Sequence, residues 1–269
     1  MSQSQIATKN VITAIKAFSD NYIWAITSTA SKHVALVDPG DARVCIDYIE
    51  QHQLILSAIL ITHHHADHIG GVEQLYHYCA EKNWPLEIFA PKNENIPFAT
   101  QKLEQDNVVE LTEFTLSFNV IDLPGHTLGH IAYYSDGILF CGDTLFSAGC
   151  GRIFEGTPQQ MHQSLTKLKN LPERTRVYCT HEYTLANLTF ALTVDPSNSE
   201  LVNYYNQAQQ LRSADKMTLP SSILREKQIN PFLRCEDENI QQSVSEYTQE
   251  ALTAELATFT ALRAWKDDF

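Results

Sequence analysis

The stretch Thr62-His63-His64-His65-Ala66-Asp67-His68-Ile69-Gly70-Gly71 determines how the rest of the chain is interpreted. It places His63, His65, Asp67 and His68 within six residues, and imidazole and carboxylate groups suit zinc, iron or manganese. Four such ligands in so short a loop cannot all reach one ion without strain, so two neighbouring ions are expected. Such a pair makes hydroxide from water at neutral pH and polarises a carbonyl or phosphoryl group. The stretch therefore predicts a metal-dependent hydrolase.

Apolar strands alternate with loops and helices through the first two thirds of the chain. Ile55–Ile61 is an apolar run typical of a buried strand, and it leads directly into the histidine loop. The further expected strands are Val11–Phe18, Tyr22–Thr27, His33–Val37, Leu86–Ala90, Phe114–Leu123, Ile131–Ser135, Ile138–Cys141 and Arg176–Cys179. Helices are expected at Ala42–Leu54 and from about Gly71 to Lys82. This order indicates a mixed α/β domain.

Three more polar residues, His126, Asp143 and His181, each follow the end of an expected strand. Strands packed in one core can bring their ends together at one rim, where ligand-bearing loops usually lie. His63 and His65 point the same way in a turn, while Asp67 and His68 can point to a second position. Each ion then needs one more nitrogen, which His126 and His181 can supply. Asp143 can bridge both ions, and Asp67 and Asp143 are the carboxylates expected to act in catalysis.

The other histidines are expected to play no direct part in metal binding. His64 lies between two ligands and is expected to face away from them. His130, four residues after His126, could support the ligands from behind, but a structural role is favoured. The remaining histidines are interpreted as solvated or hydrogen-bonded side chains: His33, His52, His77 and His162.

The character of the sequence changes after about residue 184, where no strand is expected. Helical stretches are expected at Leu185–Leu192, Glu200–Ala214 and Gln249–Lys266, with breaks at Asp195-Pro196, Leu219-Pro220 and Asn230-Pro231. We therefore predict two domains, a metal-binding catalytic domain over 1–183 and a helical substrate-binding domain over 184–269.

Composition restricts the possible partners and the compartment. The 269 residues are 43% hydrophobic, enough for a sizeable core, and carry a net charge of −13, which argues against a nucleic-acid surface. Six cysteines without CxxC spacing are expected to be free thiols in a reducing compartment. Met1–Asn10 lacks an apolar signal core, and no run approaches about 18 apolar residues. We expect a cytoplasmic protein that contacts neither membrane nor nucleic acid, and nothing demands more than a monomer.

The metal motif resembles that of the metallo-β-lactamase superfamily, whose fold is a four-layer αβ/βα sandwich. Further segments resemble the glyoxalase II family, the hydroxyacylglutathione hydrolases: Leu123-Pro124-Gly125-His126-Thr127, Phe140-Cys141-Gly142-Asp143-Thr144-Leu145-Phe146, Gly149-Cys150-Gly151-Arg152, Thr180-His181-Glu182-Tyr183-Thr184, Asn230-Pro231-Phe232-Leu233-Arg234 and Arg263-Ala264-Trp265-Lys266-Asp267. The likeness covers nearly the whole chain, including the helical tail.

The resemblance implies a ligand set and a reaction. One ion would take His63, His65 and His126, the other Asp67, His68 and His181, with Asp143 shared. The family uses two divalent ions, zinc first, with iron or manganese in its place. Its substrate is S-D-lactoylglutathione. Hydroxide held by the two metals attacks the thioester and yields glutathione and D-lactate, the second step of methylglyoxal detoxification.

The resemblance also implies which residues bind the glutathione part. A protein of charge −13 needs local cations to accept a ligand with two carboxylates. Arg152 occupies a family position that is usually Lys or Arg, and Arg263 and Lys266 match a pair that grips the glycine carboxylate. Tyr183 matches a tyrosine that hydrogen-bonds the peptide backbone. Phe154 stands where some members have a second tyrosine, which removes one hydroxyl contact worth about 0.5–1.5 kcal/mol.

Other functions remain as alternatives at this stage. The same metal motif serves superfamily hydrolases of lactones or phosphodiesters and a mononuclear-iron persulfide dioxygenase, although the dioxygenases lack the helical tail with its Arg-x-x-Lys ending. A binding module with purely structural metals would need closed sites. The sequence leaves open the metal in each site, the breadth of acyl groups, the oligomeric state and the effect of Phe154.

Overall fold

A computed structural model describes residues 10–269, and the chain forms two compact units, Met1–Ile121 and Asp122–Phe269. Each unit is described by itself. The prediction that Met1–Asn10 lacks a signal segment falls almost wholly outside the described residues.

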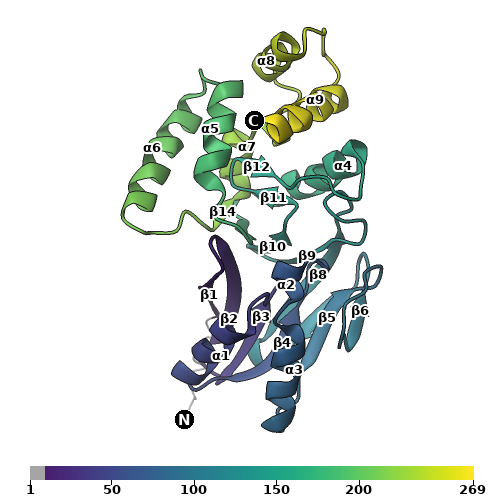
Figure 1. Cartoon of the computed structure of the whole chain (residues 1–269), viewed down its shortest axis with the longest axis vertical. Coiled ribbons are helices and arrows are strands. Elements are labelled where there is room, and N and C mark those ends of the chain that lie inside the picture. Colours follow the sequence, from purple (N-terminus) through teal and green to yellow (C-terminus); the bar gives the residue numbers. More distant parts are fainter. Residues whose placement is uncertain (1–9) are drawn as a thin grey trace, which may run out of the picture. The chain divides into compact units, whose positions relative to one another are not determined.

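The first unit is built on a six-stranded sheet in the order β1-β2-β3-β4-β5-β6 (Figure 1). Its strands are β1 (Asn10–Ala17), β2 (Asn21–Ser28), β3 (His33–Val37), β4 (Ile55–Leu60), β5 (Glu87–Pro91) and β6 (Gln101–Leu103). The first three pair antiparallel and the last four pair parallel. Because β3 and β4 are parallel neighbours, their carboxyl ends lie at the same edge, where Asp38 and the histidine loop follow them.

Helices α1 (Ala42–Gln51) and α3 (Val72–Glu81) pack on this sheet, and the single turn α2 (Ala66–Ile69) lies between β4 and α3 in sequence. Asp41 caps α1 by accepting a hydrogen bond from the backbone of Arg43 at 2.8 Å. Cys45 of α1 and Leu75 of α3 are buried in one cluster with side chains from the strands. Strand β7 (Val108–Leu111), the short 3₁₀ turn Thr112–Phe114 and all but the last residue of β8 (Leu116–Asp122) complete the unit, and β7 and β8 pair antiparallel.

Four strands of the second unit run in the order β14-β13-β10-β9. They are β9 (Ile131–Ser135), β10 (Ile138–Gly142), β13 (Arg176–Cys179) and β14 (Ser221–Ser222), and a separate hairpin consists of β11 (Leu145–Phe146) and β12 (Gly149–Cys150). Strands β10 and β13 are parallel, so Asp143 and His181 follow the carboxyl ends of adjacent strands. Helix α4 (Pro158–Lys169) begins at a capping box formed by Thr157 and Gln160.

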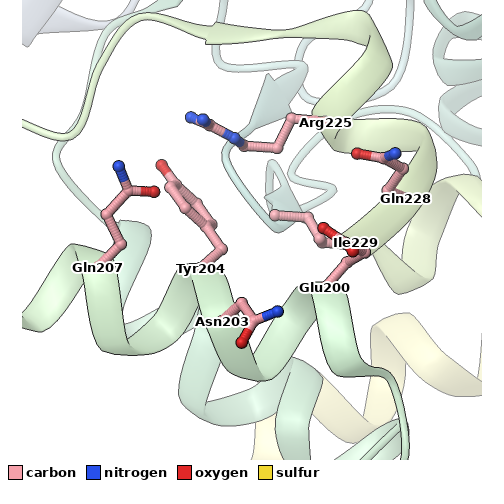
Figure 2. Close-up of a pocket in the computed structure, with 7 residues that line it drawn as sticks. All are labelled: Glu200, Asn203, Tyr204, Gln207, Arg225, Gln228 and Ile229. Carbon is pink, nitrogen blue, oxygen red and sulfur yellow. The ribbon is translucent and has the colours of Figure 1, made fainter.

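The rest of the second unit is mainly helical. Its elements are α5 (Thr184–Val194), α6 (Ser199–Ser213), α7 (Ile223–Ile229), the 3₁₀ turn Pro231–Leu233, α8 (Glu238–Thr248) and α9 (Glu255–Asp268). Helices α6 and α7 line a polar pocket of about 200 Å³ in which Tyr204 and Arg225 face one another (Figure 2). The guanidinium of Arg225 lies 4.2 Å from the centre of the Tyr204 ring. None of the predicted site residues lines this pocket.

Most predicted elements are confirmed, and the differences have local causes. The expectation of no strand after residue 184 is wrong, because the two-residue strand β14 is too short to carry a pattern. The predicted helix from Gln249 begins too early: Gln249 adopts a left-handed conformation that ends α8, and α9 starts only at Glu255. The other elements that the sequence did not predict are α2, β6, β7, β11, β12, α4, α7, the 3₁₀ turns Thr112–Phe114 and Pro231–Leu233, and α8.

Two further expectations concern the cysteines and membrane segments. All six cysteines are free and buried, as predicted. Burial raises the pKa of the Cys79 thiol to about 11. Among the described residues, no helix is both long and apolar enough to cross a membrane.

Candidate metal centre

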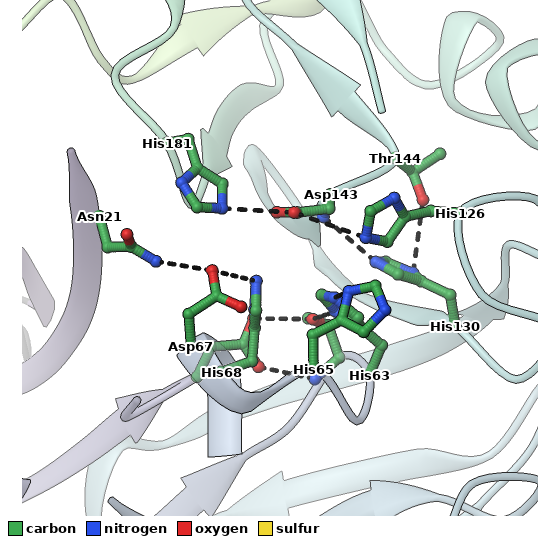
Figure 3. A network of polar contacts seen from close by, with 12 residues as sticks. Asn21, His63, His65, Asp67, His68, His126, His130, Asp143, Thr144 and His181 are labelled. Carbon is green, nitrogen blue, oxygen red and sulfur yellow. Dashed lines mark hydrogen bonds and ion pairs between the residues drawn. The ribbon is translucent and has the colours of Figure 1, made fainter. Parts of the chain in front are cut away.

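The first cluster of predicted ligands lies in the first unit, on the loop that follows β4 and on the single-turn helix α2. His63 and His68 are fully buried, whereas His65 and Asp67 are partly exposed. The Nε2 atom of His63 lies 3.1 Å from Nδ1 of His65. The Nε2 atom of His68 lies 3.6 Å from Oδ2 of Asp67. Three imidazoles and one carboxylate therefore lie close together in this part of the chain, as Figure 3 shows.

Asp38, which is not a predicted ligand, orients this cluster through contacts with Thr62 and His68. It follows β3, is 2% exposed, and accepts hydrogen bonds from the backbone nitrogen and the hydroxyl of Thr62, both at 2.7 Å. The same carboxylate lies 2.9 Å from Nδ1 of His68. Because the Thr62 hydroxyl donates to Asp38, its oxygen can accept from Nδ1 of His63, which lies 3.1 Å away. Asp38 and Thr62 therefore place the protons of both imidazoles on Nδ1 and leave Nε2 as the ligand atom.

Asp67 is oriented by a residue of β2 and by close backbone packing. The amide of Asn21 donates a hydrogen bond to Oδ2 of Asp67 at 3.0 Å. A Cβ atom at Gly40 would lie 1.9 Å from the carbonyl oxygen of Asp67, so only glycine permits this approach. Neither Asn21 nor Gly40 was among the site residues predicted from the sequence.

The second cluster lies in the second unit and consists of His126, Asp143 and His181. All three are buried, with exposed fractions of 4%, 6% and 4%. Oδ2 of Asp143 lies 3.6 Å from Nε2 of His126 and 3.3 Å from Nε2 of His181 (Figure 3). One carboxylate thus faces the same atom type of two imidazoles.

Backbone groups fix the members of this second cluster. Nδ1 of His126 lies 2.7 Å from the carbonyl oxygen of Arg152 and donates to it, which leaves Nε2 without a proton on a neutral ring. The backbone nitrogen of Asp143 donates to Nε2 of His130 at 3.2 Å. A Cβ atom at Gly151 would lie 1.9 Å from the carbonyl oxygen of Asp143, so glycine is needed there as well. His130 therefore supports the backbone of a proposed ligand, which matches the supporting role left open for it as the alternative to a structural one.

The donor arrangement of both clusters fits divalent cations. In each cluster a neutral imidazole, protonated at Nδ1, turns its Nε2 lone pair toward a carboxylate oxygen: His68 toward Asp67, and His126 toward Asp143. Two hydrogen-bond acceptors that face each other at 3.6 Å repel one another unless a cation or proton lies between them. Nitrogen and oxygen donors of this kind suit zinc, iron and manganese.

His64 is directed to a partner of its own. Its Nδ1 atom lies 3.1 Å from Oε2 of the buried Glu94. His162 contacts Glu255 at 3.1 Å, and His33 contacts the hydroxyl of Ser31 at 2.8 Å. The contacts of His33 and His162 agree with the hydrogen-bonded roles expected for these two histidines, whereas the partner of His64 was not predicted.

The aromatic residues predicted to contact substrate lie against the second cluster. The Tyr183 ring stacks on the His181 ring at 4.6 Å between centroids and 5° between planes. Phe146 packs edge-on against Tyr183 at 5.3 Å. Phe154 packs edge-on against His126 at 5.2 Å and is 61% exposed. Tyr183 and Phe154 therefore border the two imidazoles that flank Asp143.

The predicted cationic residues lie near one another in the second unit but differ in burial. Arg263 is 6% exposed, and its Nη1 donates to the carbonyl oxygen of Cys150 at 3.0 Å. The side chain of Arg152 is 55% exposed. Nζ of Lys266 lies above the rings of Phe190 and Phe269, at 5.2 and 5.3 Å, and burial together with Arg263 lowers its pKa. Asp267, which was not among the predicted site residues, contacts both arginines.

Two family models match the chain and together cover most of it. The model described as "Metallo-beta-lactamase superfamily" matches residues 19–181, and the model described as "Hydroxyacylglutathione hydrolase C-terminus" matches residues 182–269. The first match ends at residue 181 and the second begins at residue 182.

Individual proteins of known sequence or structure are also similar to this chain. It is 52% identical over 266 residues to a hydroxyacylglutathione hydrolase of Shewanella baltica, covering 96% of this chain and 99% of that one. The crystal structure of ETHE1 from Myxococcus xanthus shares the fold, with a TM-score of 0.63 at 22% identity over 97% of this chain and 100% of that chain. A protein solved in a di-iron-bound form is 27% identical, with a TM-score of 0.50 over 64% of this chain and 91% of its own.

Proposed function

The chain belongs to the hydroxyacylglutathione hydrolases of the metallo-β-lactamase superfamily, and we propose that it hydrolyses S-D-lactoylglutathione at a centre formed jointly by its two His/Asp clusters. Membership makes it a metal-dependent hydrolase of the metallo-β-lactamase fold with a helical C-terminal part. The match to the family's C-terminus over residues 182–269 favours thioester hydrolysis over persulfide oxidation. The expected domain division after residue 183 remains part of the proposal.

The proposed centre holds two divalent ions. His63, His65 and His126 would bind one, Asp67, His68 and His181 the other, and Asp143 would bind both. One observation carries this proposal. In each cluster the unprotonated Nε2 of a neutral imidazole lies 3.6 Å from a carboxylate oxygen, so that two hydrogen-bond acceptors face each other. We propose zinc as the first choice, with iron or manganese in its place. The similar protein solved with two irons is consistent with a dinuclear centre.

The metal pair, when bound, supplies a hydroxide nucleophile at neutral pH and polarises the thioester carbonyl. Other residues of the protein would orient the metal-binding side chains and the substrate. Asp38 and the Arg152 carbonyl fix the tautomers of His68 and His126. Tyr183 stacks on His181, and its hydroxyl would hydrogen-bond the peptide backbone of glutathione. Because the thiolate is a good leaving group, the reaction needs no strong general acid from the protein.

Three cations would bind the glutathione carboxylates. Arg152 is the most exposed of them, while Arg263 and Lys266 lie one turn apart on α9. Phe154 would contribute apolar contact where some relatives have a tyrosine. We propose that the protein acts as a cytoplasmic monomer on small glutathione thioesters.

The test combines a thioester assay, a metal analysis and the Asp143→Ala variant. The wild type is expected to release glutathione from S-D-lactoylglutathione and to contain about two ions per chain. Loss of a shared ligand should lower kcat/KM more than the roughly 10–100-fold typical of losing an outer-shell partner. Asp136→Ala, which removes an exposed carboxylate paired with Arg174, is the matched control and should keep both ions. Near-normal hydrolysis by the Asp143→Ala variant would overturn the proposal.

A further inference from the structure

Two of the cations proposed to bind substrate share one acidic partner on α9. Nε of Arg152 donates to Oδ1 of Asp267 at 3.0 Å, and Nη2 of Arg263 donates to the same oxygen at 3.1 Å. Nη2 of Arg152 also reaches the backbone carbonyl of Asp267 at 3.5 Å. A carboxylate of the chain itself therefore lies where two guanidinium groups converge.

The two arginines differ in how firmly they are held. Arg263 is fixed by the carbonyl of Cys150 at 3.0 Å, by Asp267, and by the Phe232 ring 5.1 Å from its guanidinium carbon. Only 8% of its side chain is exposed, against 55% for Arg152. Arg152 can therefore exchange Asp267 for another carboxylate more readily than the buried Arg263, which is also held by the Cys150 carbonyl.

We propose that Arg152, which converges with Arg263 on Asp267, joins Arg263 and Lys266 in binding the glycine carboxylate of the glutathione part. Asp267 is then the resting counter-ion of Arg152 and weakens substrate binding by competing with that carboxylate. This inference rests on the proposed function. Its physical basis is that Arg152 must give up one charge-assisted hydrogen bond to form another. Asp267 would thus set the affinity of the site without touching the reacting atoms.

The central variant is Asp267→Asn, which keeps the shape and one acceptor oxygen but removes the charge. Exposed ion pairs are weak, so KM is expected to fall by about twofold to fivefold, with kcat unchanged. The matched control is Asp268→Asn, one residue further along α9, whose side chain has no ion pair among the described residues. It makes the same change in net charge and should leave KM unaltered.

A ligand with its glycine carboxylate converted to an amide identifies the group that competes. With this analogue Asp267→Asn should give no gain, and in an Arg152→Gln background the gain should also vanish with the normal substrate. A gain that persists in either case would overturn the proposal, as would a KM for Asp267→Asn that is unchanged or higher. The last result would show that Asp267 positions Arg152 for binding.

Calorimetric titration with glutathione itself separates this inference from the proposed function. If the wild type binds glutathione but does not hydrolyse its thioester, the function fails while the Asp267 comparison still stands. Tighter glutathione binding by Asp267→Asn than by Asp268→Asn supports the inference, and equal binding overturns it.

Discussion

At the scale of single residues, proton placement on the imidazoles prepares the chain for metal binding. A histidine can bind a metal only through an unprotonated nitrogen, and the partner of the other nitrogen decides which one that is. Asp38 does this for His68, and the backbone carbonyl of Arg152 does it for His126. Neither Asp38 nor this carbonyl belongs to the proposed ligand set, yet each determines the state of a ligand.

Asp38→Asn tests this role. The amide cannot accept all three hydrogen bonds from Thr62 and His68, so metal affinity should fall by about 10–100-fold. Competition with a chromophoric chelator measures the affinity. Asp41→Asn, three residues away, serves as control because asparagine also caps a helix, and it should bind metal normally. Equal metal affinity in the two variants would contradict the role assigned to Asp38.

At the scale of elements, helix α7 holds the β11–β12 hairpin through one buried carboxylate. Glu226 is fully buried and accepts hydrogen bonds from the Ser221 hydroxyl, from the backbone of Ala148 at 2.8 Å and from the amide of Asn230 at 3.0 Å. The hairpin carries Phe146, whose ring contacts Tyr183. Glu226 therefore stabilises a segment that supports the candidate site.

The raised pKa of Glu226 should make the stability of the protein depend on pH. Burial raises its pKa above the ordinary value of 4.5. Between pH 4.5 and the raised pKa the folded protein binds more protons than the unfolded chain, so stability falls as pH rises. The difference in free energy of unfolding between wild type and Glu226→Gln should therefore shrink as the pH rises above 4.5, by at most about 1.4 kcal/mol per pH unit. Chemical unfolding at several pH values measures it, and a constant difference would contradict the raised pKa.

At the scale of the whole molecule, metal binding should contribute to stability. A ligand that binds only the folded state at 1,000 times its Kd adds about 4 kcal/mol. Removing the metals by chelation should therefore lower Tm by about 10 °C and abolish hydrolysis. Reloading with zinc, iron or manganese in separate samples, followed by melting and assay, identifies which ions restore both. A Tm that chelation leaves unchanged would argue against the proposed ions.

The sequence by itself determined the class of chemistry and most of the strands. The proposed ligands between His63 and His68 lie close together in the sequence, so their pattern can be recognised without a structure. The strands that lead to site residues contain apolar runs, which can also be recognised in the sequence. It also indicated the helical C-terminal part and the cations Arg152, Arg263 and Lys266, whose binding roles stay predictions. Short elements such as β11, β12 and β14 have too few residues to carry a period and could not be predicted.

Only the tertiary structure decided how these residues are held. Asp38 lies 30 positions before His68, Asp267 lies 115 positions after Arg152, and the carbonyl that fixes His126 belongs to residue 152. Such contacts depend on which strand ends and helix faces pack together, because hydrogen bonds form between neighbours in space and not in sequence. The local sequence pattern therefore predicts which residues bind metal. Tertiary packing determines which nitrogen of each histidine carries the proton, how the side chains are oriented and which carboxylate pairs with Arg152.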